Sequence, residues 1–315
     1  MTQSILGNIS VEDFLSNYWQ KKPLLIRGAI PNFRAPIDGD ELAGLALEAE
    51  VESRLVVSEK WTLEHGPFEE ERFATLPPNH WTLLVQAVDL WVPEVGALMK
   101  YFDFLPPWRI DDIMVSYAED GGSVGPHFDY YDVFLLQGAG QRRWQIGAPC
   151  DAESPLVKDA ELKILAEFEA LEDWVLEPGD MLYLPPMVSH HGVALGACTT
   201  FSVGFRAPAA TEMLDDLATE LLTGIVAPKH LMDPPLTPAM AADHIPDTYL
   251  KRVKALLLET LDDDRMLAEW FAQFMTAPKY PMLVDETGEL RSASVKHDDG
   301  TVSRYKNGLK DELLP

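Results

Sequence analysis

The region from Trp108 to Arg206 is divided into short apolar segments that are separated by glycine and proline. Segments of this length with such boundaries are typical of β-strands, and a long series of them favours an antiparallel sandwich or barrel. We predict strands at residues 110–117, 132–137, 143–146, 174–176, 180–184 and 199–206. The sequence therefore predicts a mainly β fold for its central part.

Apolar residues recur with helical spacing on both sides of this region. On the N-terminal side we predict a strand at 24–28 and helices at 11–20, 40–50 and 81–91, with Asp40 as the cap of the second helix. On the C-terminal side we predict helices at 211–225, 247–261 and 264–276 and short β-prone pieces at 281–284 and 301–305. The expected fold class is α+β, mainly β with helical additions.

The chain of 315 residues is strongly acidic, with 51 acidic against 25 basic side chains and a net charge of −26. Such a surface repels the phosphate backbone of nucleic acids, so no direct nucleic-acid binding is expected. It would attract a basic protein, although acidity can also serve only to keep a protein in solution. Both explanations stay open on charge alone.

Cysteine content and hydropathy bear on the location of the protein. Cys150 and Cys198 are the only cysteines, which excludes a disulfide framework and a cysteine-rich metal site. No apolar run approaches the roughly 20 residues that cross a bilayer. The N-terminus lacks the basic start and apolar stretch of a signal peptide. We expect a cytoplasmic protein without a membrane segment.

Three residues predict a metal site, namely His127, Asp129 and His190. Residues i and i+2 of a strand point to the same face, so the first two side chains can hold one ion. Two imidazoles and one carboxylate with open positions form the facial triad of non-haem Fe(II) oxygenases. An isolated histidine is more often a packed or surface residue, but the upstream pair makes His190 a candidate ligand. Its neighbour His191 should point to the opposite face.

The open coordination positions also favour one metal over another. Zinc sites with three protein ligands usually leave one position open and perform hydrolysis. A triad that is open on one face can take a bidentate cosubstrate and still bind oxygen, which favours Fe(II). The same ligands could also hold manganese, nickel or zinc.

Turn motifs frame the candidate site. Residues 121–126, Gly-Gly-Ser-Val-Gly-Pro, form either a functional loop or an ordinary hairpin connection before His127. Residues 177–180, Glu-Pro-Gly-Asp, have the pattern of a type II turn. Residues 138–141 are predicted as a hairpin turn before Arg142 and Arg143, one of which should point into the barrel. A buried guanidinium there needs an anion such as the distal carboxylate of 2-oxoglutarate, unless both arginines lie on the surface.

Several stretches together resemble the bacterial ribosomal oxygenases of the JmjC/cupin type. The resemblance covers about the first 210 residues and continues more weakly into the helices after Pro208. It rests on residues 18–23, 41–46, 81–88, 108–112, 125–127, 132–134, 142–144 and 202–208, which read YWQKKP, ELAGLA, WTLLVQAV, WRIDD, GPH, DVF, RRW and SVGFRAP.

This resemblance implies a double-stranded β-helix barrel in residues 1–207, a helical dimerisation region in 208–262 and a small winged-helix-like module in 263–315. It implies Fe(II) held by His127, Asp129 and His190, with 2-oxoglutarate as cosubstrate contacted by Arg142 and Ser116, and O2 as oxidant. The implied protein is a homodimeric 2-oxoglutarate/Fe(II)-dependent dioxygenase. Its implied reaction is hydroxylation of an arginine side chain in a large-subunit ribosomal protein.

Some details depart from the family pattern or stay open. The tail after Lys279 is shorter than the family's usual C-terminal module, so we expect that module to be reduced, truncated in this chain or differently built. Thr200 stands where relatives often carry an amide near the metal. An apolar stripe after Pro208 fits either a dimer contact or packing within one chain, and it consists of Leu214, Leu217, Leu221 and Leu222.

Residues close in sequence to the ligands are candidates for the substrate entrance. Carboxylates and aromatic rings there would hold a guanidinium group, or they serve only for solvation. The candidates are Asp120, Tyr130, Tyr131 and Asp132. Other activities stay open, namely a JmjC-type hydroxylase of histidine, a demethylase of another basic protein, a small-molecule hydroxylase or a non-catalytic cupin scaffold.

Overall fold

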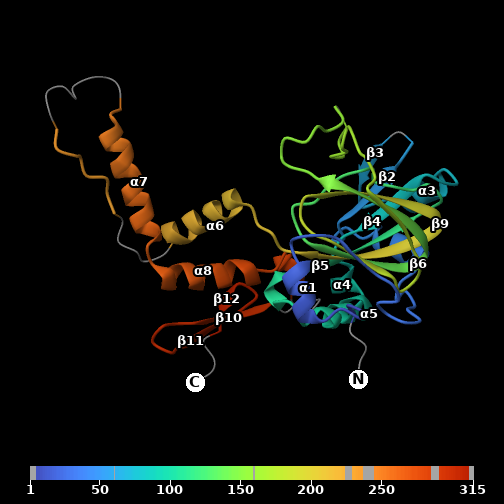
Figure 1. The fold of residues 1–315 in the computed structure, drawn as a ribbon, viewed down its shortest axis with the longest axis horizontal. Helices are drawn as coiled ribbons and strands as arrows, with labels where there is room; N and C mark the ends of the chain where they lie inside the picture. Colours follow the sequence, from blue (N-terminus) through green and yellow to red (C-terminus); the bar gives the residue numbers. More distant parts are fainter. Residues whose placement is uncertain are drawn as a thin grey trace. The chain divides into compact units, whose positions relative to one another are not determined.

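The computed structural model describes residues 5–59, 61–158, 160–223, 229–236, 245–284 and 291–311. These residues form two compact units, and the chain passes from the first to the second between Ala207 and Pro208 (Figure 1). The first unit contains the strands of the central region, and the second unit is mainly helical.

Within the described residues, nine strands of the first unit form one antiparallel sheet in the order β1-β8-β6-β9-β5-β4-β2-β3, with β7 added beside β6. The strands are β1 Leu24–Ile26, β2 Ser53–Val57, β3 Thr62–His65, β4 Trp81–Val85, β5 Ile110–Ala118, β6 Val133–Pro149, β7 Glu172–Leu176, β8 Met181–Leu184 and β9 Val188–Phe205. The long strands β6 and β9 curve through the unit and pair along most of their length (Figure 1). The prediction of a mainly β, antiparallel fold is confirmed.

Alternation along β6 separates the two faces of the sheet. Phe134 and Leu136 enter the larger core, which also contains Phe14 and Phe102 from the N-terminal region. Val133 and Leu135 point to the other face, where they line a cavity. This period of two residues is the ordinary consequence of strand geometry. The strand therefore serves the core with one face and the cavity with the other.

The hairpin turn predicted at residues 138–141 is wrong. β6 continues through these residues, and its register with β9 shifts after Gln137 and again after Ala139. A Cβ at Gly138 would lie 2.5 Å from Thr199 Oγ1, so the missing side chain lets the two strands stay paired. The glycines mark a β-bulge inside a long strand, which their sequence does not distinguish from a turn.

Short helices of the first unit cover the core. They are α1 Val11–Asn17, α2 Gly39–Leu45, α3 Glu70–Ala74, α4 Val88–Trp91 and α5 Pro93–Gly96, followed by the 3-10 helices η1 Ala97–Phe102 and η2 Pro107–Arg109. The cap predicted for the second helix is wrong, because Asp38 and not Asp40 accepts the hydrogen bond from the Glu41 amide. Glu41 accepts from the Asp38 amide in return, which completes a capping box.

The helix predicted at residues 81–91 is wrong in its first half. Residues 81–85 form β4, which pairs with both β2 and β5. Ala87, with a φ of 50°, separates this strand from α4. Four of the five β4 residues are buried, so the run has no polar alternation. An apolar run that is buried on both faces cannot be told from a helix by periodicity.

Asp132 is a structural residue and not a substrate contact, which corrects the prediction from sequence. Its carboxylate is fully buried and accepts hydrogen bonds from the Tyr183 hydroxyl (2.7 Å) and from Gln20 Nε2 (3.1 Å). Arg109 Nη2 forms an ion pair with it at 3.4 Å. The Tyr183 hydroxyl also accepts from the Gln20 amide at 2.7 Å. These bonds fasten the segment after α1 to β6 and β8.

Replacing Asp132 with alanine should destabilise the protein by about 3 kcal/mol, because it leaves buried donors without their acceptor. Urea unfolding of wild-type and variant protein measures this loss. Asp173→Ala is the matched control, since it removes a carboxylate from the exposed pair with Arg143. Exposed ion pairs contribute little, so that variant should unfold like the wild type. Equal losses in the two variants would contradict the structural role of Asp132.

The second unit contains α6 Ala210–Thr223, α7 Asp247–Leu261, α8 Asp264–Thr276, the 3-10 helix η4 Pro281–Leu283 and a small antiparallel sheet of β10 Ser292–Lys296, β11 Val302–Lys306 and β12 Leu309–Lys310. Trp270 on α8 donates a hydrogen bond to Asp216 on α6 at 2.7 Å.

The helices predicted after Pro208 and the strand predicted at 301–305 are confirmed. Residues 224 and 225 of the first of these helices lie outside the described residues. The β-prone piece at 281–284 is instead a 3-10 helix that begins at Pro281. No helix in the described part of the chain is long and apolar enough to cross a membrane.

Candidate active site

A backbone bridge brings two distant histidines of the predicted metal site together. The His127 amide donates to the His190 carbonyl (3.0 Å), and the His190 amide donates to the His127 carbonyl (2.8 Å). Two residues further on, the Asp129 carbonyl accepts from the Met187 amide at 2.7 Å. One possible ligand atom from each of His127, Asp129 and His190 lies within 4.8 Å of the other two. The three side chains can therefore hold one ion.

Backbone carbonyls orient both imidazole rings. Nδ1 of His127 lies 2.9 Å from the Gly125 carbonyl, and Nδ1 of His190 lies 3.0 Å from the Val188 carbonyl. Because a carbonyl only accepts, each Nδ1 carries the proton and each Nε2 presents its lone pair. Nε2 of His190 lies 3.7 Å from Oδ2 of Asp129. Two imidazole nitrogens and a carboxylate suit a divalent transition metal, so the donor set fits Fe(II).

The segment before His127 needs glycine for a physical reason. Gly125 has a φ of +84°, and a Cβ there would lie 3.0 Å from Ile164 Cγ1. Only glycine is free of strain in this conformation and at this distance. The predicted type II turn is also confirmed, since Gly179 has a φ of +88° and the Asp180 amide donates to the Glu177 carbonyl at 2.9 Å.

His191 lies away from the three converging side chains. Its Nε2 is 3.0 Å from Ser123 Oγ, and its ring contacts Phe168 edge to face. Alternation along β9 sends His190 and His191 to opposite faces of the strand. Of these two neighbours, His190, at 3% exposure, is the one that faces the cavity.

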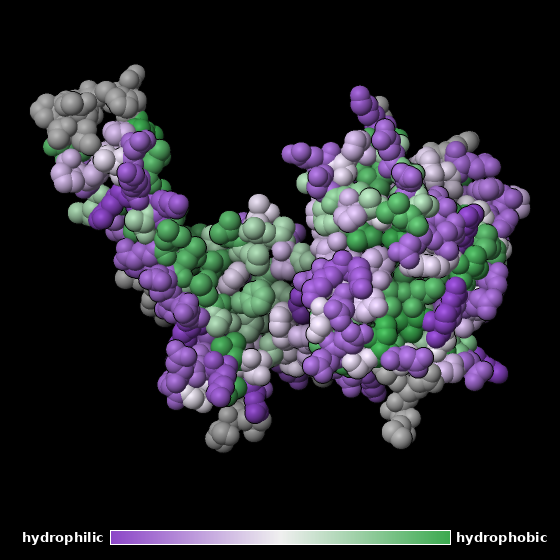
Figure 2. All heavy atoms as spheres, viewed as in Figure 1, coloured by the Kyte–Doolittle hydropathy of each residue, from purple (hydrophilic) through white to green (hydrophobic). Residues whose placement is uncertain are grey.

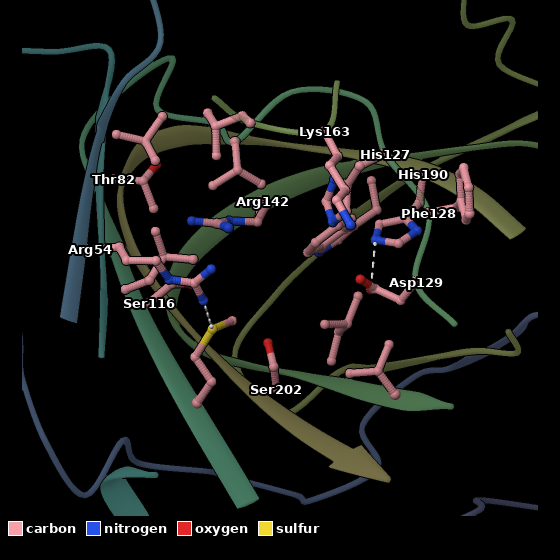
Figure 3. A pocket seen from close by; sticks show the side chains of 18 of the residues that line it. Arg54, Thr82, Ser116, His127, Phe128, Asp129, Arg142, Lys163, His190 and Ser202 are labelled. Carbon is pink, nitrogen blue, oxygen red and sulfur yellow. Dashed lines mark hydrogen bonds and ion pairs between the residues drawn. The ribbon is translucent and has the colours of Figure 1, made fainter. Parts of the chain in front are cut away.

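The three converging side chains line a cavity of about 230 Å³ inside the barrel (Figure 3). Arg142 lines the same cavity and is only 5% exposed. Its Nε and Nη2 atoms have no hydrogen-bond partner among the described residues. Its neighbour Arg143 points outward and pairs with Asp173. The prediction of one inward and one outward arginine is confirmed, and the inward one fits an anionic ligand.

Of the residues predicted to contact the substrate, some line the cavity and others lie outside it. Tyr131 lines the cavity, whereas Tyr130 is 54% exposed with its ring 5.5 Å from that of Phe128. Asp120 does not line the cavity, and its carboxylate accepts a hydrogen bond from the Gly196 amide at 2.8 Å. Tyr131 is also exposed, at 41% of its surface, but desolvation around its hydroxyl and the nearby Asp129 carboxylate raise the pKa of Tyr131, so the hydroxyl stays protonated at neutral pH.

The cavity also contains residues that the sequence did not reveal. Ser116 on β5 lines the cavity as expected. Thr200 does not line it, and the Thr200 hydroxyl instead donates a hydrogen bond to Gln137 at 3.2 Å. A reading of residues 53–57 and 81–85 with a period of two would have found some of the missed residues. The polar or charged residues missed are Arg54, Thr82, Lys163 and Ser202.

The buried His190 imidazole should make the stability of the metal-free protein depend on pH. Burial and, to a smaller extent, the neighbouring His127 lower the pKa of His190 to about 4. In the unfolded chain the pKa of histidine is about 6.5, so between these values the unfolded state binds the extra proton. The contribution of His190 to stability is therefore complete above about pH 6.5 and is lost as the pH falls towards 4.

Urea unfolding of the metal-free protein across this pH window measures the effect. His190→Gln, which cannot take up the proton, should show a shallower fall in the free energy of unfolding than the wild type. Parallel pH profiles for the two proteins would contradict the low pKa.

Comparison with known proteins identifies the family. Residues 97–213 match the family model of the JmjC domain. Over 273 residues the chain is 41% identical to the ribosomal protein uL16 3-hydroxylase of Escherichia coli (strain K12), which covers 86% of this chain and 72% of that protein. The chain belongs to the JmjC-type ribosomal oxygenases. It is also 35% identical over 323 residues to a probable ribosomal oxygenase of Haemophilus influenzae, covering 96% of this chain and 78% of that protein.

A solved structure of a relative has the same fold as this oxygenase. The ribosomal oxygenase YcfD from Escherichia coli, in complex with cobalt and 2-oxoglutarate, aligns with a TM-score of 0.81 and 34% identity, over 97% of this chain and 86% of that chain. The predicted double-stranded β-helix of the JmjC/cupin type is thereby confirmed. So is the prediction of a 2-oxoglutarate- and Fe(II)-dependent dioxygenase.

Proposed function

We propose that this oxygenase hydroxylates an arginine side chain of a large-subunit ribosomal protein. The observation that carries the proposal is one cavity that contains the converging His127, Asp129 and His190 together with the buried, unpaired Arg142. The name of the Escherichia coli relative, a 3-hydroxylase of ribosomal protein uL16, supports a ribosomal protein as substrate. The net charge of −26 supports a basic one.

His127 and His190 would hold Fe(II) through Nε2, and Asp129 would hold it through a carboxylate oxygen. When bound, Fe(II) and 2-oxoglutarate supply the oxidising chemistry with O2. The carbonyls of Gly125 and Val188 keep the imidazole rings in position, so the ligands need no reorientation when the metal binds. The apolar cavity walls exclude water from the reacting carbon, and they include Val133, Leu135 and Trp144.

Arg142 and Ser116 would bind the distal carboxylate of 2-oxoglutarate. The Arg142 guanidinium can donate two parallel hydrogen bonds to a carboxylate, and its Nε and Nη2 atoms have no other acceptor among the described residues. Ser116 is 3% exposed on β5 and lines the same cavity. Its hydroxyl can donate one further bond.

The target arginine would enter beside the aromatic residues next to Asp129. Tyr131 lines the cavity, and the Phe128 and Tyr130 rings lie edge to face. Aromatic faces attract a guanidinium group, and the Tyr131 hydroxyl can hydrogen bond to it. Asp120 is exposed and does not line the cavity, so in this proposal its carboxylate would contact the flanking peptide of the substrate outside the cavity.

Intact-mass profiling of ribosomal proteins tests the proposal. Large-subunit proteins from cells without this gene are incubated with the purified enzyme, Fe(II) and 2-oxoglutarate in air. We expect one basic protein to gain the mass of one oxygen atom on an arginine side chain, with one succinate formed for each oxygen gained. The His127→Ala protein controls for oxidation without the enzyme.

Each other outcome of this experiment has a definite meaning. Oxygen on a histidine would overturn the arginine assignment, and formaldehyde release would indicate demethylation. An unchanged mass profile, with no succinate formed, would overturn the function as a ribosomal protein hydroxylase.

The helices after Pro208 support a homodimer as part of the proposal. In α7 no residue is buried, and Leu250, Leu257 and Leu258 are each more than half exposed. Figure 2 shows hydrophobic residues at the surface of this part of the chain. Several exposed apolar side chains along one helix are typical of a surface that contacts another protein chain. The mass of the protein in solution measures the oligomeric state.

The remaining expectations are also parts of this proposal. Residues 208–262 would form the dimer contact, and the described strands β10, β11 and β12 with α8 would belong to the small C-terminal module. A cytoplasmic location would place the enzyme with the ribosomes that carry its substrate.

A further inference from the structure

Arg54 and Thr82 are among the polar cavity residues that have no role in the function proposed above. Thr82 is fully buried, and its hydroxyl has no hydrogen-bond partner among the described residues. Arg54 is half-buried and lines the same cavity. It lies on β2, which pairs with β4, the strand that carries Thr82. A buried hydroxyl without a partner costs free energy, so its persistence points to a ligand that satisfies it.

The sheet register places these groups with Ser116. Arg54 on β2 pairs with Leu84 on β4, and Leu84 pairs with Ser116 on β5. Thr82 lies two residues before Leu84 on β4 and therefore faces the same side of the sheet. All of these side chains line the cavity. Figure 3 shows Arg54, Thr82 and Ser116 on the same side of the cavity as the Arg142 guanidinium, away from the Asp129 carboxylate.

Arg54 has no carboxylate partner among the described residues. Its Nη2 lies 3.4 Å from the amide oxygen of Gln86 and 3.7 Å from the sulfur of Met114, which are weak and uncharged acceptors. The amide nitrogen of Gln86 donates in turn to the Asp112 carboxylate at 2.8 and 3.0 Å. This arrangement orients the Arg54 side chain without neutralising its charge.

Two guanidinium groups that face one small cavity repel each other unless an anion lies between them. Arg142 is almost fully buried, so its charge has little solvent to stabilise it. One carboxylate offers about four acceptor positions, enough for both guanidinium groups and for a hydroxyl. The end of the cavity that holds Arg54, Thr82 and Arg142 therefore suits a carboxylate.

We propose that Arg54 and Thr82 complete the site for the distal carboxylate of the cosubstrate and thereby select 2-oxo acids that carry two carboxylates. The inference rests on the cosubstrate role proposed above for Arg142. Arg54 contributes the second positive charge, and the Thr82 hydroxyl donates a hydrogen bond. A 2-oxo acid with a single carboxylate leaves both cations without their anion, so it binds weakly at this end.

Equilibrium binding to the Co(II)-loaded protein without oxygen tests this assignment independently of turnover. The ligands are 2-oxoglutarate and 2-oxobutyrate, which lacks the distal carboxylate. Arg54→Met should raise the Kd of 2-oxoglutarate about 10- to 100-fold, because a charged hydrogen bond is lost. Thr82→Val, which keeps the volume of the side chain, should raise it about 10-fold. The Kd of 2-oxobutyrate should stay unchanged in both variants.

Arg143→Met is the matched control, since it removes a guanidinium from the neighbouring, outward position. It should leave both Kd values unchanged. Wild-type 2-oxoglutarate affinity in folded Arg54→Met and Thr82→Val proteins would overturn the proposal. An equal rise for both acids would also overturn it, because the substitutions would then act on the metal site. If Arg54→Met does not fold, Thr82→Val alone decides, since valine fits the space of threonine.

Failure here differs from failure of the proposed function. The binding measurement contains no ribosomal protein, so it gives the same answer whichever substrate the enzyme has. Unselective binding together with arginine hydroxylation would overturn only the present inference. Selective binding without any oxidised ribosomal protein would overturn only the function.

Discussion

The Asp129→Ala protein should bind metal and form hydroxylated product at least about 100-fold less well than the wild type. Removing a group that merely orients a metal ligand costs about 10- to 100-fold, so removing a ligand itself should cost no less. The carboxylate lies 3.7 Å from Nε2 of His190 and supplies the only negative charge among the three converging groups. Metal analysis of the purified protein and mass spectrometry of the ribosomal product measure the two losses.

The fold should survive this substitution, because the Asp129 side chain is 22% exposed. Its backbone carbonyl, which accepts from Met187, is unchanged in the variant. Asp173→Ala removes a carboxylate outside the cavity and should keep full activity. A metal content and turnover equal to the wild type in Asp129→Ala would contradict the metal site. A protein that acts only as a scaffold would keep its partner binding in this variant and would show no product before the substitution either.

The Arg142→Met protein should lose 2-oxoglutarate binding by at least about 30-fold, since truncating one partner of a buried charge pair costs 2–5 kcal/mol. The same substitution should leave the ligand-free protein at least as stable as the wild type. Arg142 is 5% exposed, with Nε and Nη2 unpaired and the Trp144 ring 5.8 Å from its guanidinium carbon, so methionine removes a buried charge that has no carboxylate partner among the described residues. Thermal unfolding with and without 2-oxoglutarate measures both effects.

Arg143→Met is again the appropriate control, because its guanidinium pairs with Asp173 on the outer face. We expect that variant to keep the increase in Tm that 2-oxoglutarate causes in the wild type. A strong loss of stability in ligand-free Arg142→Met would contradict this prediction, because it would mean that the guanidinium stabilises the folded barrel. Unaltered 2-oxoglutarate binding in Arg142→Met would remove the basis for the carboxylate site.

The candidate ligands could be predicted from sequence because local rules govern them. His127 and Asp129 are two residues apart in an extended segment, and alternation distinguishes His190 from His191. The same rule separates Arg142 from Arg143. Each of these predictions needs only the period of a strand, and none needs to know which strands are neighbours.

Thr82 and Arg54 show where such rules end. Residues 81–85 are apolar apart from Thr82, and their burial on both faces removed the alternation that marks a strand. The bulge at Gly138 and Gly140 was predicted as a turn because glycines permit both. Asp132 was expected near a substrate because it lies close in sequence to the metal ligands. It directly precedes β6, and its carboxylate instead accepts hydrogen bonds from Tyr183 and Gln20. In each case a contact with a distant segment decided the outcome.

Taken alone, the sequence determined the family, the positions of most strands and helices, and the residue types that can bind a metal ion and an anion. It did so because turn residues, alternation and motif spacing are local properties of the chain. The tertiary structure alone decided which side chains share one cavity. The bridge between His127 and His190 and the register of β2, β4 and β5 join segments far apart in sequence. A register shift of one residue would turn each strand's cavity-facing side chains to the other face, so long-range pairing controls the site.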